Sequence, residues 1–160
     1  MKTPIENRDL TQQAPHSPRD RFGGFAIIGR TVDKCRASIS GKLGEYHYDC
    51  PLDNRLFSFK GINADQFKIA VASATNYEDV AAWLQVNGAP KTPEEISAWS
   101  DRVEATKLKE IFDKHSQAEG QEILDSCRKL GIDFGTATLF QWLDADDEAS
   151  FEPHGQLATH

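Results

Sequence analysis

Apolar residues along this chain recur at intervals of three and four, which is the spacing of helices with one buried face. The longest such stripe begins at Phe25, ends at Ile39 and is followed by Gly41, a residue typical of helix C-termini. Its members are Phe25, Ile28, Val32, Cys35 and Ile39. The pattern therefore predicts a long first helix that packs one face into a core.

Further helices are predicted along the rest of the chain. Pro51 suits the first position of a short helix that Gly61 closes, and Thr92–Glu95 (TPEE) is a capping-box pattern with proline at the first helical position. The other helical stripes are Phe67, Val71 and Ala74; Tyr77, Val80 and Leu84 after a capping Asn76; Ile96, Trp99 and Val103; Leu108, Ile111 and Phe112; Ile123, Leu124, Cys127 and Leu130; and Leu139, Phe140, Trp142 and Leu143. Alternation with period two is almost absent, so the expected fold class is all-α.

The expected architecture is a single compact multi-helix domain over residues 17–148. A short irregular or extended polar segment, residues 44–50, lies between the first long helix and the short helix that follows it. Residues 1–16 are polar and interrupted by prolines, which predicts a disordered or loosely docked segment. Order is expected to begin at SPRD, where Ser17 can cap a first turn. Residues 149–160 lack periodicity and are predicted to form a mobile tail.

Composition narrows the class of protein. With 160 residues, 39% of them hydrophobic and 27% charged, the chain suits one ordinary soluble domain. No apolar run approaches the roughly 20 residues that span a bilayer, and the N-terminus lacks the apolar stretch of a secretory signal. The three cysteines show no CxxC spacing, which is typical of reduced thiols. We therefore expect a cytoplasmic protein with no membrane partner.

The charge is unevenly distributed. The net charge is −7, yet residues 1–60 carry +3 and residues 61–160 carry −10. Because an acidic chain without a basic stripe binds phosphate backbones poorly, we expect no nucleic-acid partner. If a small anionic ligand binds, the first sixty residues are the expected place.

The stretch GEYHYDCPLD, residues 44–53, concentrates side chains that can carry chemistry. The proline after Cys50 favours a helix start, which makes Cys50 the N-cap and places Asp53 at the third helical position. A thiol at a helix N-terminus is a candidate nucleophile, with His47 as its base. Against this, Asp49 and Asp53 bring negative charge to the same thiol. The alternative is that Asp49 or Cys50 only caps the helix. The candidate catalytic residues are thus His47, Cys50 and Asp53.

The same stretch allows a second interpretation, as a metal site. If the backbone is extended, Glu45, His47 and Asp49 point to one side, and two carboxylates with an imidazole suit a divalent ion. A second ligand cluster is missing, and no HExxH spacing exists. These three residues are therefore only candidate metal ligands, and no specific motif implies a cofactor.

A third group of candidates lies on the polar face of the first long helix, at Arg30, Asp33 and Lys34. Acidic and basic residues three apart on this face can pair as a solvent-exposed surface. Alternatively, this face meets the segment that contains Glu45, His47 and Asp53 and forms a semi-buried charged network. Such networks bind anions through arginine, or they are purely structural. The candidate ligand-binding residues are Arg30, Asp33, Lys34, Glu45, His47 and Arg55.

Four stretches carry a resemblance to a known family: SPRDRFGGF, DKCRASISGKLGEYHYDCPLDNR, EEISAW and WLDADDEASF. Over nearly the whole length, from about Pro15 to Phe151, the chain resembles a bacterial family of small cytosolic proteins catalogued as a domain of unknown function. The resemblance implies one intact cytosolic domain and implies no activity.

Two classes of function follow from these observations. The first is a small binding or interaction module, in which a polar pocket between the first long helix and the Glu45–Arg55 segment holds a small anionic ligand or a protein partner. The alternative is a small enzyme that uses His47 and Cys50, or a divalent metal held by Glu45, His47 and Asp49.

Overall fold

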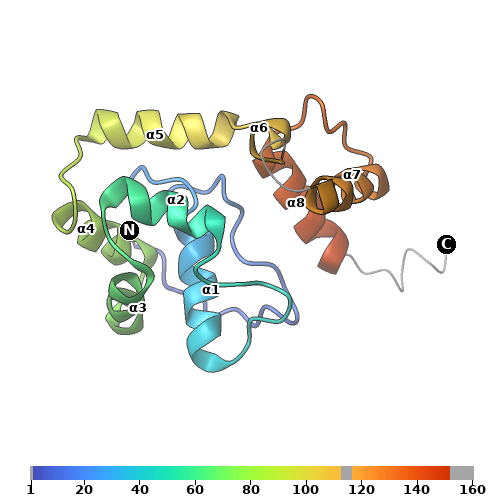
Figure 1. The fold of residues 1–160 in the computed structure, drawn as a ribbon. Coiled ribbons are helices and arrows are strands. Elements are labelled where there is room, and N and C mark those ends of the chain that lie inside the picture. The colour runs from blue at the N-terminus through green and yellow to red at the C-terminus, as the bar shows by residue number, and fades with distance from the viewer. Residues whose placement is uncertain (1, 113–116, 152–160) are drawn as a thin grey trace. The chain divides into compact units, whose positions relative to one another are not determined.

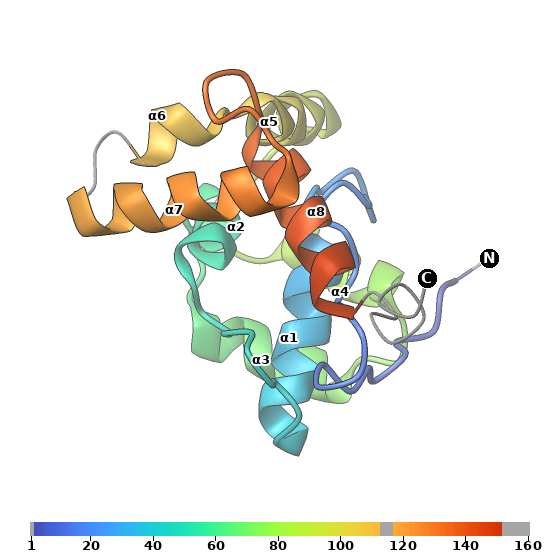
Figure 2. The same cartoon turned by 90° about the vertical axis from the view of Figure 1, so that its right-hand side faces the viewer.

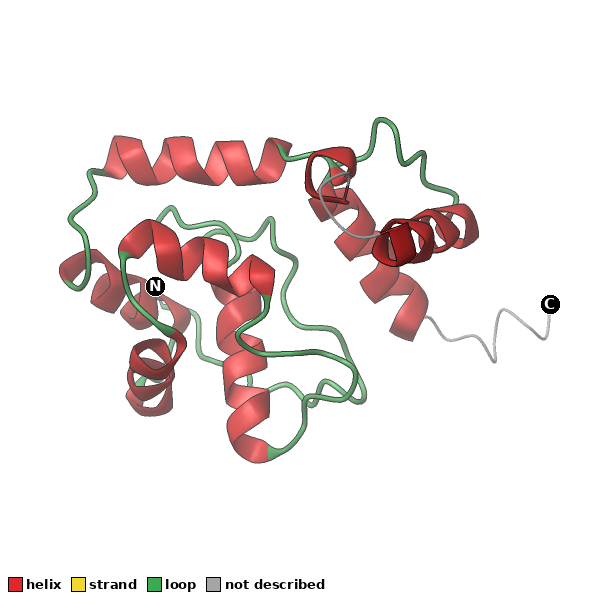
Figure 3. Ribbon diagram, viewed as in Figure 1, coloured by secondary structure: helices red, strands yellow, loops and turns green. Residues whose placement is uncertain are grey.

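A computed structural model describes residues 2–112 and 117–151. Figure 3 shows helices joined by loops, and the described residues contain isolated bridges but no strand. The predicted all-α class is therefore confirmed. The helices are α1 (Ile28–Ser40), α2 (Pro51–Lys60), α3 (Ala64–Ser73), α4 (Tyr77–Val86), α5 (Pro93–Ala105), α6 (Leu108–Phe112), α7 (Gln117–Leu130) and α8 (Leu139–Phe151). None of the described helices is both long and apolar enough to cross a bilayer.

The chain divides into two compact units, residues 1–101 and 102–160, called unit 1 and unit 2 below. The boundary between the two units falls within α5. In unit 1, α2, α3 and α4 gather around α1 (Figure 1). Its buried apolar residues come from all four helices and from the segment just before α1, as shown by Phe25, Val32, Phe57, Phe67 and Leu84.

Local capping signals place most helix ends where the sequence predicts them. The side chain of Asn76 accepts a hydrogen bond from the Asp79 N–H (2.8 Å) at the start of α4. Thr92 and Glu95 form the predicted capping box of α5, with bonds of 3.1 and 2.8 Å. At its C-terminus, α1 ends at Gly41 in a left-handed conformation, with φ 72°.

The start of α1 differs from the prediction by three residues. Phe25 was expected inside the helix, but it forms a two-residue bridge with Phe22 through backbone bonds of 3.1 and 3.3 Å. The buried hydroxyl of Ser100 holds the same turn, since it accepts from the Ala26 N–H and donates to the Gly24 carbonyl. These tertiary bonds delay the helix until Ile28, and the helical stripe alone carries no sign of them.

The N-terminal segment, residues 2–16, packs on the rest of unit 1. The sequence predicted a disordered or loosely docked segment, but backbone bonds join Ile5 to Thr75 (3.0 Å) and Leu10 to Lys42 (2.9 Å). Leu10 is 1% exposed. Backbone hydrogen bonds and the buried side chains of Ile5 and Leu10 together fasten this segment.

Unit 2 is built from α6, α7 and α8, together with the end of α5. Figures 1 and 2 both show α7 beside α8, and the Trp142 indole donates to the Ser126 hydroxyl at 2.8 Å between them. A bridge between Lys107 and Thr138 joins the start of α6 to the start of α8. Helix α8 continues to Phe151, so residues 149–151 are helical, and the rest of the predicted tail lies outside the described residues.

Candidate functional site

The polar face of α1 is buried. Arg30, Thr31, Asp33 and Lys34 are each at most 3% exposed, although a polar helix face ordinarily faces water. The N-terminal segment lies against one part of this face, and the start of α2 lies against another. Of the two interpretations offered by the sequence, the structure has the buried network and not the solvent-exposed surface.

The first part of this network is the Asp53 cluster, which comprises Thr31, Lys34, Cys50 and Asp53. The fully buried Asp53 carboxylate accepts a hydrogen bond from the Thr31 hydroxyl (2.9 Å) and forms an ion pair with the Lys34 ammonium (2.9 Å). The same ammonium donates to the Cys50 sulfur at 3.2 Å. Both partners of this carboxylate oxygen therefore come from α1.

The local sequence around Cys50 explains how this cluster forms. Cys50 is the N-cap of α2, with Pro51 at the first helical position and Asp53 at the third, as predicted. The other oxygen of Asp53 accepts from the backbone N–H groups of Asp49 (2.9 Å) and Cys50 (3.3 Å), which completes a capping box. Asp53 thus serves both as a cap and as the partner of the buried Lys34.

The Cys50 thiol differs from the other two. All three cysteines are free, but Cys35 and Cys127 are buried and Cys50 is half-buried. Burial raises the pKa of Cys35 to about 11 and also raises the pKa of Cys127. Cys50 instead lies at a helix N-terminus beside a lysine ammonium, so positive charge faces its sulfur.

The second part of the network is the Asp33 cluster, which comprises Arg8, His16, Asp33 and Tyr77. One oxygen of the fully buried Asp33 accepts from the Tyr77 hydroxyl at 2.5 Å. The other accepts from the His16 backbone N–H (2.8 Å), contacts His16 Nδ1 (2.6 Å) and lies 3.9 Å from the Arg8 guanidinium. Burial, together with the bond to Asp33, raises the pKa of Tyr77.

The imidazole of His16 is held on several sides. Its ring packs edge-on against Phe22 and Tyr77, and its Nε2 lies 3.8 Å from a Glu6 oxygen. His16 was not among the predicted site residues, because residues 1–16 were expected to lie outside the ordered domain. A signal was available in Leu10, an apolar residue in an otherwise polar stretch.

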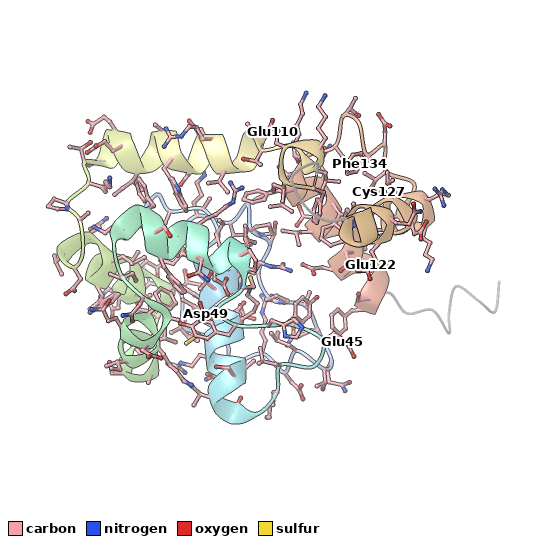
Figure 4. All side chains as sticks on the ribbon, viewed as in Figure 1. Glu45, Asp49, Glu110, Glu122, Cys127 and Phe134 are labelled. Carbon is pink, nitrogen blue, oxygen red and sulfur yellow. The ribbon has the colours of Figure 1, made fainter. Side chains whose placement is uncertain are left out.

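The side chains of the remaining candidates do not join this network. Glu45, His47, Asp49 and Arg55 are exposed. Figure 4 shows Glu45 and Asp49 at separate points of the loop. Among the described residues, no group of three or more histidine, cysteine, aspartate or glutamate side chains could hold a metal ion, so the candidate ligands Glu45, His47 and Asp49 are not grouped as a metal site.

The physical reason is the backbone of residues 44–50. Two turns interrupt this segment, and Gly44 and Asp49 have positive φ angles of 60° and 68°. Side chains therefore do not alternate as they do on an extended strand. His47 makes no hydrogen bond with Cys50 among the described contacts, and Lys34 is the titratable side chain that donates to the thiol.

Arg30, which the sequence proposed as an anion ligand, contacts parts of its own unit. Its guanidinium donates to the His16 carbonyl (3.5 Å) and lies 5.5 Å from the centre of the Tyr46 ring, within cation–π range. The predicted pocket between α1 and the Glu45–Arg55 segment thus holds side chains of the chain itself.

An open groove lies elsewhere on unit 1, between α3 and α4. It has a volume of about 470 Å³, and three of the residues that line it have small side chains, Ala70, Ser73 and Ala74. Ile69, which is 73% exposed, and Trp83 are the large apolar side chains that line it. The remaining lining residues are Gln66 and Asp79.

Asp79 is the charged residue among those that line the groove, called the α3–α4 groove below. It forms a surface ion pair with Lys2 at 2.8 Å, and this bond is the main cause that lowers the pKa of Asp79. Asn76 donates to its other oxygen at 2.9 Å. The groove therefore combines apolar surface with a carboxylate that already binds an exposed ammonium.

Comparison with known proteins connects the chain to one family. The family model described as "Domain of unknown function (DUF5069)" matches residues 12–149. This confirms the resemblance to a domain of unknown function. No curated protein matches the chain.

Proposed function

The chain belongs to the DUF5069 family, whose description names no activity, and from its geometry we propose that it is a protein-interaction module. Its binding surface is the α3–α4 groove, and its ligand is a protein segment that presents an apolar side chain next to a basic one. The observation that carries this proposal is the exposure of Ile69 at a groove with a carboxylate at its side.

The size and lining of the groove support a segment of a few residues. A volume of about 470 Å³ is within the range of roughly 300–1,000 Å³ typical of binding pockets. The small lining residues Ala70, Ser73 and Ala74 leave room beside α3 for the backbone of a bound segment. Burying Ile69 and Trp83 removes apolar surface from water, which is the main source of affinity at such sites.

The charge of the groove selects a basic neighbour for that apolar side chain. Lys2 already demonstrates the interaction, because its ammonium binds Asp79 at 2.8 Å while its own side chain is 64% exposed. An exposed pair of this kind contributes about 0–1 kcal/mol, so a lysine or arginine of a partner can replace Lys2.

The binding class agrees with the first expectation from the sequence, but the surface is a different one. Of the three cations expected to hold a small anion, Lys34 is engaged by Asp53 and Arg30 by Tyr46, and Arg55 is exposed. Three free thiols support the expected cytoplasmic location, where cysteines stay reduced.

Titration with two synthetic peptides tests the proposal. One peptide carries adjacent leucine and arginine in a polar background, and the other has glutamate in place of arginine. We expect the first to shift the NMR signals of the Trp83 indole and the Ala70 amide, and the second to bind at least several-fold more weakly. Equal binding of both peptides would rule out the assigned chemistry.

Three variants locate the binding surface. Ile69→Lys should abolish binding, whereas Val86→Lys places the same charge on another exposed apolar residue, 82% exposed and outside the groove lining, and should leave binding unchanged. Lys2→Ala frees Asp79 and should strengthen binding of the arginine peptide. If Val86→Lys weakens binding as much as Ile69→Lys, the groove is not the site.

A further inference from the structure

We propose that Cys50 and Lys34 form a reversible covalent cross-link, a sulfenamide, when a peroxide oxidises the Cys50 thiol. The Lys34 nitrogen lies 3.2 Å from the Cys50 sulfur. Sulfenic acids condense with nearby nitrogen nucleophiles, so an amine already in contact with the sulfur is a ready partner. This site lies on α1 and the start of α2 and does not depend on the α3–α4 groove.

The fixed position of Lys34 favours this reaction. Lysine side chains are usually mobile on the surface, but Lys34 is 3% exposed and its ammonium is held 2.9 Å from Asp53. The amine therefore stays beside the sulfur and keeps one orientation. A contact already at hydrogen-bond distance needs only a small movement of the two side chains to become a bond.

Access of the oxidant selects Cys50 among the three thiols. Cys50 is half-buried, whereas Cys35 and Cys127 are at most 2% exposed, so Cys50 is the thiol residue most open to a small peroxide. The thiolate is the reactive form of cysteine. The Cys50 sulfur lies at the N-terminus of α2 and contacts the Lys34 ammonium, which Asp53 also holds.

The chemistry balances in two steps. In the first, the sulfur attacks hydrogen peroxide, the O–O bond breaks, a sulfenic acid forms and one water leaves; sulfur is oxidised and peroxide is reduced. In the second, the Asp53 carboxylate takes one proton from the Lys34 ammonium, and the amine nitrogen attacks the sulfur. The S–O bond breaks, the S–N bond forms, and the hydroxyl leaves as water with a second proton from nitrogen.

The product joins the middle of α1 to the first turn of α2. It also protects the sulfur from oxidation to the sulfinic and sulfonic acids. Those later stages of cysteine oxidation are irreversible, whereas the sulfenic acid is reversible. A thiol such as dithiothreitol reverses the link, because its thiolate attacks the sulfur, releases the Lys34 amine, and a second thiol then reduces the mixed disulfide.

Mass spectrometry of the full chain after treatment with hydrogen peroxide tests the proposal. We expect the reduced protein to lose about 2 Da, the mass of two hydrogens, and to regain it with dithiothreitol. A tryptic map made without reductant should show an uncleaved Lys34 joined to the peptide that contains Cys50. Cys127→Ser should form the same product, and Cys50→Ser should not.

A second variant separates the cross-link from a disulfide. In Lys34→Arg the amine is gone, so the sulfenic acid at Cys50 should persist and react with dimedone, whereas wild type should resist labelling. A 2-Da loss that survives in Lys34→Arg identifies a disulfide and overturns the proposal. If circular dichroism shows that this variant is unfolded, the wild-type map decides alone. In that case the proposal is refuted if the map shows Cys50 only as the free thiol, as an over-oxidised acid or in a disulfide.

Discussion

Replacing Asp33 by asparagine tests whether the Asp33 cluster stabilises unit 1. The buried carboxylate accepts three hydrogen bonds, from the Tyr77 hydroxyl (2.5 Å), the His16 backbone N–H (2.8 Å) and the His16 ring (2.6 Å). Asparagine keeps the shape of the side chain, but it removes the charge and turns one acceptor into a donor.

The expected loss follows from these bonds. A hydrogen bond to a charged group contributes roughly 1.5–3 kcal/mol, and a neutral one about 0.5–1.5 kcal/mol. If the asparagine oxygen faces His16, two bonds weaken to neutral strength and the Tyr77 hydroxyl must reorient. We therefore expect Asp33→Asn to lower the free energy of unfolding by about 3 kcal/mol.

Urea unfolding followed by circular dichroism measures this loss. Asp101→Asn is the matched control, since Asp101 forms a single surface pair with Arg21 and should cost below about 1 kcal/mol. Native-state hydrogen exchange adds a local test: the amides of Ile5 and His16 should lose more protection than those in the middle of α2. A change in Asp33→Asn below about 1 kcal/mol would refute the assigned role.

Two further predictions concern pH and backbone geometry. Burial raises the pKa of Cys35 to about 11, so the folded state holds this proton more tightly than the unfolded state. The wild-type protein should therefore lose on the order of 2 kcal/mol of unfolding free energy as the pH rises from the ordinary thiol pKa toward 11. Urea unfolding at several pH values should show that Cys35→Ala lacks this loss. Parallel pH profiles of the two proteins would contradict the prediction. A Cβ at Gly88 would lie 1.9 Å from the Lys60 carbonyl oxygen, whereas a Cβ at Gly41 meets nothing within 4 Å, and both residues have φ 72°. In thermal melting, Gly41→Ala should lower stability only by the cost of a left-handed alanine, about 1–2 kcal/mol, and Gly88→Ala should lower it much more. Equal losses of stability would show that the loop at Gly88 moves to accept the methyl group.

Features set by neighbouring residues could be predicted from the sequence. Asn76, Thr92 and Cys50 cap helices because each needs only the backbone two or three positions ahead. The same locality explains the glycines that end α1 and α2. These signals predicted Cys50 as the N-cap of α2 and Asp53 at its third position, and the structure adds that the Asp53 carboxylate completes the cap.

Features that depend on distant partners could not be predicted in the same way. Asp33 is bonded to His16, 17 positions away, and to Tyr77, 44 positions away. A helix with charged residues on one face predicts exposure unless those partners are known. Lys34 was a candidate ligand-binding residue because of its place on the polar face of α1. Its partner Cys50 was listed with the candidate catalytic residues, so the contact between the two was not predicted.

The docked N-terminal segment has a practical consequence for work on this family. The family match begins at residue 12, yet Ile5 and Leu10 are buried and Arg8 approaches Asp33. A shortened chain cut at the family boundary would leave apolar surface bare and the carbonyls of Thr75 and Lys42 without their donors. Recombinant fragments of this protein should therefore start no later than Lys2, whose ammonium binds Asp79 on α4.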